Sequence, residues 1–251
     1  MIYVMSDIHG NLRRFNSIME QINLTDKDTL YVLGDVIDRY PDGIRILRKL
    51  MAMDNVKMTI GNHEDMMLKS LYTNTIGLSA KEQFKHEQMV RLWYDNGGRV
   101  THNYLKHIRK NLRTEIFTYL ESLPVSYDIT VNGKEYKLVH AAPEEMFDEY
   151  YKLRYTESRE FAIWHRIKGR DIIPGNYTLI FGHTPTVYFQ YTIPLRIYHK
   201  VRYICIDCGA GTAEAPGAFS GFCYGRLACL RLDDMKEFYS EEDYKENEQQ
   251  N

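Results

Sequence analysis

The first sixty residues alternate short apolar, β-branched runs with stretches of helical periodicity, and this pattern constrains the fold more than any other feature of the chain. The apolar runs cover residues 2–5, 29–33 and 56–60, and apolar side chains recur at helical spacing within 12–22 and 44–51. Both connections are long enough for a helix that crosses over to a parallel strand. The sequence therefore predicts an α/β fold with βαβ units and a largely buried sheet.

A cluster of acidic, amide and imidazole side chains follows directly after each of these three strands. The clusters are Asp7-Ile8-His9, Gly34-Asp35-Val36-Ile37-Asp38-Arg39 and Gly61-Asn62-His63-Glu64. Helix capping or a surface ion pair could explain any one of them alone. Ligands bind beyond the carboxyl ends of strands in open α/β sheets, however, so three such clusters in succession predict one shared crevice.

Two further histidines end later strands in the same way. His140 closes the predicted strand 135–140, and His183 follows the predicted strand 177–182. Two aspartates, one asparagine and three histidines then form a mixed oxygen and nitrogen donor set. This set suits Mn²⁺, Fe²⁺ or Zn²⁺ better than Ca²⁺. Asp35 is central in it and is the natural carboxylate to bridge two cations.

The remainder of the chain divides into a helical stretch and a second group of strands. Residues 63–123 are predicted to form a helical insertion or cap, with a break at 96–98 and an end at Pro124. The turn Asn132-Gly133 predicts a hairpin between strands 127–131 and 135–140. The other expected strands are 177–182, 202–207 and 222–232. We expect one domain over 1–234 and an acidic, polar tail over 235–251.

Composition excludes several classes of protein. The formal net charge of −2 gives no field that would attract a nucleic acid, so a dedicated nucleic-acid binder is disfavoured. No apolar run approaches the length of a membrane span, and the first residues lack the features of a signal peptide, so we expect a cytoplasmic protein. The four cysteines are expected to be reduced and buried, and a zinc or redox role for the Cys205-x-x-Cys208 pair is disfavoured because no second such pair follows. The sequence does not determine the oligomeric state.

Five motifs occur in order between Asp7 and Asp207, namely D-x-H, G-D-x-x-D-R, G-N-H-E, a later histidine and G-H-T-P. Together they resemble the motifs of the calcineurin-like metallophosphoesterases. The resemblance is to the phosphoprotein phosphatase branch, and in particular to its small bacterial members. It implies an α+β sandwich of central mixed β-sheets flanked by helices. It also implies two divalent metal ions, with Mn²⁺ expected and Fe²⁺ or Zn²⁺ as alternatives.

The resemblance assigns a role to each matching residue. The first metal would be held by Asp7, His9 and Asp35, and the second by Asp35, Asn62, His140 and His183. A hydroxide that bridges the metals would attack the phosphorus in line. His63 would be the general acid, with Asp38 hydrogen-bonded to it and raising its pKa. Arg39 would hold the phosphoryl oxygens together with Asn62 and a second arginine, for which Arg166 is expected and Arg170 is the alternative.

Substrate choice is less constrained than reaction type. The expected substrates are phosphomonoesters, most of all phosphoserine and phosphothreonine in proteins. The alternative is a symmetrical dinucleoside tetraphosphate, because a related branch uses nearly the same metal ligands. In that branch the position of Asp38 is commonly not Asp, which favours the phosphoprotein. A catalytically inactive relative that serves as a binding module would have lost ligands, and here all are present.

The sequence also departs from the family pattern near the expected cleft. Tyr40 stands where the family usually has Gly, and would narrow the mouth of the site or offer a stacking surface. Residues 210–219, rich in Ala, Gly and Pro, predict a surface loop that borders the active site. Both departures bear on substrate choice and leave the type of reaction unchanged.

Overall fold

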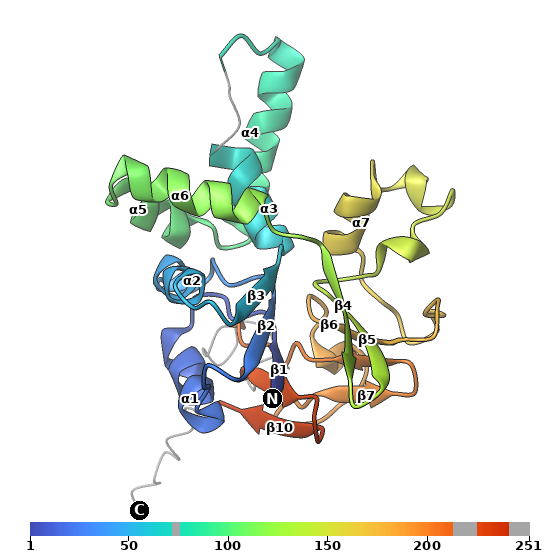
Figure 1. The fold of residues 1–251 in the computed structure, drawn as a ribbon. Helices are drawn as coiled ribbons and strands as arrows, with labels where there is room; N and C mark the ends of the chain where they lie inside the picture. The colour runs from blue at the N-terminus through green and yellow to red at the C-terminus, as the bar shows by residue number, and fades with distance from the viewer. Residues whose placement is uncertain (72–75, 213–224, 241–251) are drawn as a thin grey trace, which may run out of the picture.

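The computed structural model describes residues 1–71, 76–212 and 225–240, which form two five-stranded sheets with helices around them (Figure 1). In the first sheet the strand order is β10-β9-β1-β2-β3, and in the second it is β4-β5-β6-β8-β7. The predicted fold class, two mixed sheets flanked by helices, is confirmed.

Three parallel strands form the centre of the first sheet, as the alternating pattern predicts. They are β1 (Ile2–Met5), β2 (Thr29–Leu33) and β3 (Val56–Thr59), joined by helices α1 (Leu12–Ile22) and α2 (Gly43–Met51). Strands β1 and β2 are buried on both faces after their first residue, whereas β3 exposes Lys57. Met5 and Val32 pack toward the helices, whereas Val4 and Leu33 pack against the second sheet. Burial on both sides explains why the runs of β1 and β2 are almost continuously apolar.

The second sheet begins with the predicted hairpin. Strands β4 (Ser126–Val131) and β5 (Lys134–Val139) pair antiparallel. Asn132 and Gly133 both have positive φ, 49° and 75°, as a two-residue type I′ turn requires. Parallel to β5 run β6 (Thr178–Phe181) and then β8 (Tyr203–Cys205). The carboxyl ends of β5 and β6 deliver His140 and His183.

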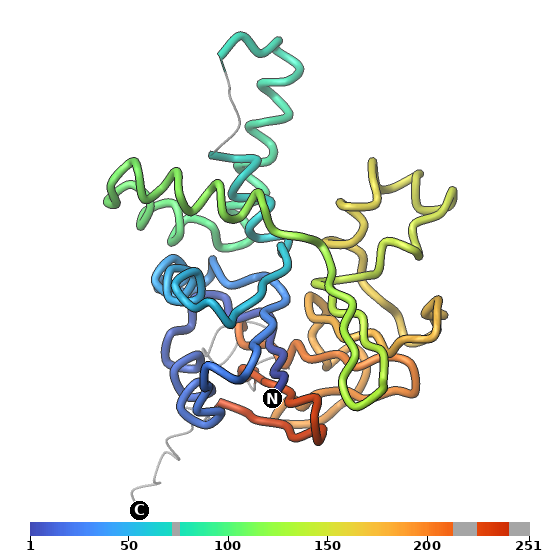
Figure 2. The backbone as a smooth tube through the Cα atoms, in the orientation of Figure 1, coloured from blue at the N-terminus to red at the C-terminus, as the bar shows by residue number. Residues whose placement is uncertain are grey.

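Four helices lie between β3 and β4 in the chain. They are α3 (Asn62–Leu71), α4 (Ala80–Asp95), α5 (Arg99–Lys106) and α6 (Lys110–Glu121). The turn between α4 and α5 is the predicted break, where Gly97 has φ +100°. These helices stand beyond one end of the first sheet, with α4 projecting farthest (Figure 1). Figure 2 shows the chain passing from this segment directly into the second sheet.

The structure differs from the predicted elements in the last third of the chain. Strand β10 (Lys236–Tyr239) lies inside the stretch predicted to be a tail, and it pairs with β9 (Ala228–Arg231) because Phe238 packs into the core. Strand β9 is shorter than the predicted 222–232, of which 222–224 lie outside the described residues, as do 241–251 of the predicted tail.

Several short elements were not predicted at all. Beside β8 lies the short edge strand β7 (Tyr198–Lys200), and the segment that follows β5 contains η1 (Glu144–Met146), η2 (Tyr151–Leu153) and α7 (Ser158–Trp164). A third 3₁₀ turn, η3 (Thr186–Tyr188), follows β6. Cys205, Cys208 and Cys229 are free and buried, and Cys223 lies outside the described residues. None of the described helices combines the length and apolarity that a membrane span needs.

Candidate active site

The polar clusters after the strands converge on one buried centre. Asp7 follows β1, Asp35 follows β2 and Asn62 follows β3, while His140 and His183 arrive from the second sheet. All five are at most 7% exposed. The centre therefore lies where the carboxyl ends of the parallel strands of both sheets meet.

The backbone around this centre is held in an unusual conformation. Positive φ angles, which non-glycine residues rarely adopt, occur at six of the predicted site residues. They are Asp7 (54°), His9 (50°), Asp35 (53°), Asp38 (71°), Arg39 (66°) and His183 (60°). Such strain persists only where the surrounding structure fixes it, and it gathers at functional sites.

Asp35 lies at the middle of the donor set. Its Oδ2 is 3.8 Å from Nε2 of His9, 3.8 Å from Nε2 of His63 and 3.5 Å from Nε2 of His140. Two groups of side chains could each hold a metal ion, His9 with Asp35 and His63, and Asp35 with His140 and His183. Asp35 belongs to both groups, as a bridging carboxylate must.

The remaining predicted ligands complete the two groups. Oδ1 of Asp7 lies 3.9 Å from Nε2 of His9, and Oδ1 of Asn62 lies 3.0 Å from Nε2 of His140. All six predicted metal ligands are thus brought together. His63 also faces the first group through Nε2, a position that the sequence alone did not indicate.

Backbone carbonyls orient the three predicted histidine ligands. Nδ1 of His9 bonds to the carbonyl of Ile37 at 3.2 Å, and Nδ1 of His140 bonds to that of Leu33 at 2.7 Å, so each ring turns Nε2 to the centre. His183 uses Nε2 instead, bonded to the carbonyl of Trp164 at 3.2 Å. Burial lowers the pKa of His9, His140 and His183 and favours the neutral imidazole that binds metals.

The acidic residues of the centre also fit divalent cations. Burial, followed by the charges of Asp207 and Asp35, raises the pKa of Asp7 well above its usual value. Burial likewise raises the pKa of Asp207 to about 6. Three carboxylates in a buried site repel one another, and a bound cation of charge +2 would offset that repulsion. Asp207 follows β8 as the predicted ligands follow their strands, so its place near the centre could have been predicted from the sequence, although no role was predicted for it.

His63 is held by an acidic partner on its other ring nitrogen. Its Nδ1 lies 2.7 Å from Oδ2 of Asp38, and both side chains are at most 1% exposed. Burial acts to lower the pKa of His63, but the carboxylates of Asp35 and Asp38 outweigh it and raise that pKa above its usual value. The imidazole therefore tends to keep a proton, with Nε2 directed at the centre.

Two arginines lie close to the centre. Nη2 of Arg39 lies 3.4 Å from Nε2 of His63, and Nη1 of Arg166 donates to the carbonyl of His183 at 2.5 Å. Both line the active-site cavity of about 420 Å³. Arg170 does not line it, so the structure brings in Arg166 rather than the alternative.

The third motif ends in Glu64, and the hydrogen bonds of this side chain show its structural role. This fully buried carboxylate accepts backbone N–H bonds from Asp35 (2.8 Å), Val36 (2.9 Å), Ile37 (3.3 Å) and Gly61 (3.2 Å). Burial, followed by the charge of Asp35, raises its pKa to about 7. Glu64 thus fixes the loop that carries Asp35.

Two residues near the mouth of the site were expected to matter for the substrate. The hydroxyl of Tyr40 donates to the carbonyl of Thr212 at 2.9 Å, and Tyr40 does not line the cavity. A Cβ at Gly211 would lie 2.3 Å from the His9 ring, so the start of the predicted 210–219 loop does border the site. Residues 213–219 lie outside the described part of the chain.

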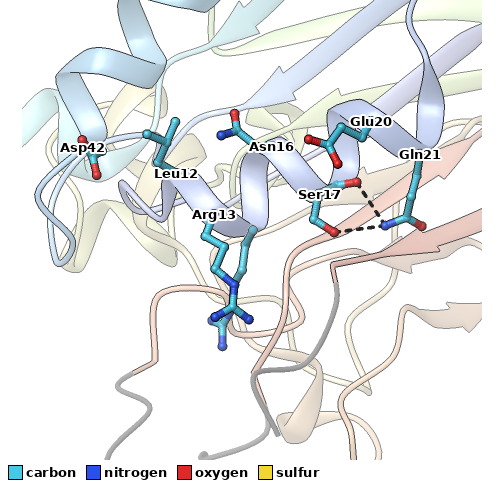
Figure 3. Close-up of a pocket in the computed structure, with 8 residues that line it drawn as sticks. Leu12, Arg13, Asn16, Ser17, Glu20, Gln21 and Asp42 are labelled. Atoms are coloured by element: carbon cyan, nitrogen blue, oxygen red, sulfur yellow. Dashed lines mark hydrogen bonds between the residues drawn. The ribbon is translucent and has the colours of Figure 1, made fainter. Parts of the chain in front are cut away.

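A larger cavity of about 740 Å³ lies elsewhere, along α1 (Figure 3). Its lining includes Arg13, Ser17, Gln21 and Asp42, and Ser17 and Gln21 are hydrogen-bonded to each other. None of the six predicted metal ligands lines this cavity. Size alone therefore does not identify the functional site, whereas the chemistry of the lining does.

Comparison with known proteins agrees with this geometry. The model of the calcineurin-like phosphoesterase family matches residues 1–208. The symmetrical bis(5′-nucleosyl)-tetraphosphatase of Buchnera aphidicola subsp. Schizaphis graminum is 35% identical over 74 residues, 29% of this chain and 27% of that protein. The protein of the same name from Pectobacterium atrosepticum is 33% identical over 72 residues, 28% of this chain and 25% of that protein. These matches span about a quarter of the length of the curated relatives.

Solved structures share the fold over nearly the whole chain. A crystal structure provisionally assigned as a diadenosine tetraphosphatase superposes with a TM-score of 0.57 at 17% identity, covering 95% of this chain and 91% of the other. A metallophosphoesterase from Sphaerobacter thermophilus gives 0.52 at 16% identity, with coverage of 97% and 89%. With the ordered motifs, the ligand geometry and a family match over more than four-fifths of its length, the chain belongs to the calcineurin-like phosphoesterases.

Proposed function

We propose that this protein is a hydrolase that cleaves symmetrical dinucleoside tetraphosphates into two nucleoside diphosphates. It would use two divalent metal ions, and Mn²⁺ is the expected ion. The observation that carries the choice of substrate is the number of cationic side chains in the active-site cavity, which exceeds the three carboxylates there, Asp7, Asp35 and Asp207, even before a metal ion binds. Arg154 and Lys168 line it in addition to Arg39 and Arg166. Four cations exceed what a single phosphoryl group needs, and they suit a chain of several phosphates. The names of the curated relatives support the same substrate.

The residues divide the work as their positions indicate. Asp7, His9 and Asp35 would hold one ion, and Asp35, Asn62, His140 and His183 the other. When bound, the two ions would lower the pKa of a water molecule and stabilise negative charge on the phosphate. Arg39 and Arg166 would orient the attacked phosphoryl group, so that their positive charge meets the charge that develops in the transition state.

His63 would complete the hydrolysis. The bond between the attacked phosphorus and the central bridging oxygen breaks, and the oxygen of water joins the phosphorus. His63 Nε2 gives its proton to the departing oxygen, while Asp38 holds Nδ1 and stabilises the charged imidazole. One water molecule is consumed, and both products are nucleoside diphosphates.

A phosphoprotein is the second candidate substrate, and Asp38 is the observation that favours it. The 2.7 Å contact between Asp38 and His63 helps to keep the histidine protonated, and a protonated general acid matters most for a poor leaving group such as the oxygen of serine. The curated relatives favour the dinucleotide, so we rank the phosphoprotein second.

A parallel assay would separate the two substrates. The Mn²⁺-loaded protein would be given diadenosine tetraphosphate, a phosphoserine/phosphothreonine peptide, a phosphotyrosine peptide and p-nitrophenyl phosphate, with Asp35→Asn as the inactive control. The highest kcat/KM is expected for diadenosine tetraphosphate, with ADP as the product. Preference for a phosphopeptide would overturn the assignment of the dinucleotide and leave the hydrolase in place.

A further inference from the structure

A second cavity adjoins the active site and continues it away from the metal ligands. It measures about 250 Å³, and Arg154, His165 and Lys168 line both cavities. The shared lining places the two cavities side by side, and we refer to them together as the trough. The second cavity is built from η2 with its flanking residues and from the segment that follows α7, and α7 lies to the right of the helical insertion in Figure 1.

Between the two cavities stands a buried polar atom that has no hydrogen-bond partner among the described residues. His165 is 6% exposed, and within the described part of the chain its Nε2 makes no hydrogen bond. The ring cannot turn easily, because it stacks on Phe161 at 4.5 Å and meets Tyr151 edge-on at 4.7 Å. Its Nδ1 lies 3.3 Å from the hydroxyl of Tyr155. A polar group buried in this way costs free energy unless a ligand or water binds it.

The charge of the side chains that line the second cavity is positive. Arg154 and Lys168 lie at the junction, and Arg170 lines the far cavity. The one carboxylate there, Asp171, accepts a 2.8 Å bond from the backbone N–H of Lys168 and lies 3.9 Å from Nε2 of His165. Three cations against one engaged carboxylate favour an anion that extends from the active site into the second cavity.

The second cavity, but not the active-site cavity, is also lined by an exposed aromatic ring. Tyr150 is 74% exposed, and its ring meets that of Tyr151 edge-on at 5.3 Å. An exposed ring beside cations suits a planar base that carries phosphate, because a base stacks on an aromatic face while the cations hold its phosphates. We infer that this second cavity, hereafter the distal subsite, binds the departing nucleoside diphosphate half of a dinucleoside tetraphosphate.

In this arrangement, which rests on the proposed function, the attacked phosphate lies at the metal ligands and the leaving half spans the junction. Arg154 and Lys168 contact its phosphates, Nε2 of His165 meets its polar groups, and Tyr150 stacks on its base. The distal subsite thus selects a substrate with a nucleoside on both sides of the scissile bond. An aryl phosphate reaches only the metal ligands and gains nothing from the distal subsite.

Two variants and a matched control test the distal subsite. The variants are Tyr150→Ala and Arg170→Ala, and the control is Tyr191→Ala, a tyrosine that is 79% exposed and lines neither cavity. The measurement is the KM for diadenosine tetraphosphate divided by the KM for p-nitrophenyl phosphate. We expect this ratio to rise about tenfold in Tyr150→Ala, the size expected when a stacked base is lost, and severalfold in Arg170→Ala. Tyr191→Ala should leave the ratio unchanged.

An unchanged ratio in both variants would overturn the distal subsite while leaving the proposed function intact.

A wild-type protein that cleaves p-nitrophenyl phosphate but not diadenosine tetraphosphate would refute the proposed function instead. The distal subsite would then be tested with ADP as an inhibitor of p-nitrophenyl phosphate hydrolysis. Weaker inhibition in Tyr150→Ala than in wild type would support it, and equal inhibition would contradict it. If the variants affected only an acidic phosphopeptide, the assignment to a nucleotide would be wrong.

Discussion

Nε1 of Trp93 donates a 2.8 Å hydrogen bond to Oδ2 of Asp38, the same oxygen that lies 2.7 Å from Nδ1 of His63. Trp93 belongs to α4 and is fully buried. The helical segment therefore reaches the predicted general acid through one intermediate side chain. The helical segment also contacts the loop that carries Asp38 and Arg39 at two other points. The hydroxyl of Thr101 accepts a hydrogen bond from the backbone N–H of Asp38, and the carbonyl of Gly97 accepts one from the backbone N–H of Arg39.

Replacing Trp93 by Phe should slow the reaction while leaving metal binding unchanged. The variant removes one hydrogen bond to a charged, buried group, worth about 1.5–3 kcal/mol, so the rate on a poor leaving group should fall about tenfold to a hundredfold. Good leaving groups need less proton donation and should be affected less. Rates on aryl phosphates of graded leaving-group pKa would measure this. Tyr94→Phe, which loses a bond to His102 outside the site, is the control, and equal losses across the series would contradict the role of Trp93.

Gly98→Ala should destabilise the protein. A Cβ at this position would lie 2.3 Å from Nε1 of Trp93, and the ring cannot move away without losing its bond to Asp38. Overpacking of this kind costs about 1–3 kcal/mol, so the urea midpoint should fall and activity with it. Gly169→Ala is the matched control, because nothing lies within 4 Å of its added Cβ. A Gly98→Ala protein as stable and active as wild type would show that the ring has room to shift.

The sequence indicated most of the central fold and the position of the site because both depend on local pattern. Strands β1 and β2 are buried on two faces and so form apolar runs in the sequence, and the polar residue after each parallel strand marks the strand end. Asp7, Asp35 and His183 could be located in this way. The distant partners of these residues follow no such pattern. Trp93 has the spacing of an ordinary core residue, and only tertiary packing directs its Nε1 at Asp38.

Short edge strands could not be predicted from local pattern either. Strand β7 contains Tyr198, His199 and Lys200, and β10 begins with Lys236 and Glu237. Runs of three or four residues with charged side chains carry too little alternation to indicate a strand. They form because a neighbouring strand offers unpaired backbone groups. The trough beside the active site was missed for a similar reason, since turns and the short helix α7 assemble it.

The stability of the protein should depend on pH partly through His165. Burial lowers the pKa of this imidazole, so the folded protein keeps it neutral while the unfolded chain takes up a proton as pH falls through about 6.5. Its contribution to stability is therefore lost below that pH. Urea unfolding at pH 8 and pH 5 should show a smaller loss of stability in His165→Phe than in wild type. His107→Phe replaces an exposed histidine and should retain the wild-type loss. Equal losses in all three proteins would contradict this prediction.

Asp35→Asn and His63→Asn should separate metal binding from proton transfer. Asp35 belongs to both groups of potential ligands, so its loss should abolish binding of the two ions and with it all turnover. His63 is held by Asp38 and is proposed to donate a proton, so His63→Asn should still bind two ions and lose about a hundredfold to ten-thousandfold in rate on a poor leaving group. Calorimetric titration with Mn²⁺ would count the ions in each variant. If His63→Asn bound only one ion, His63 would be a metal ligand, which agrees with its Nε2 lying 3.8 Å from Oδ2 of Asp35. Another residue would then have to donate the proton.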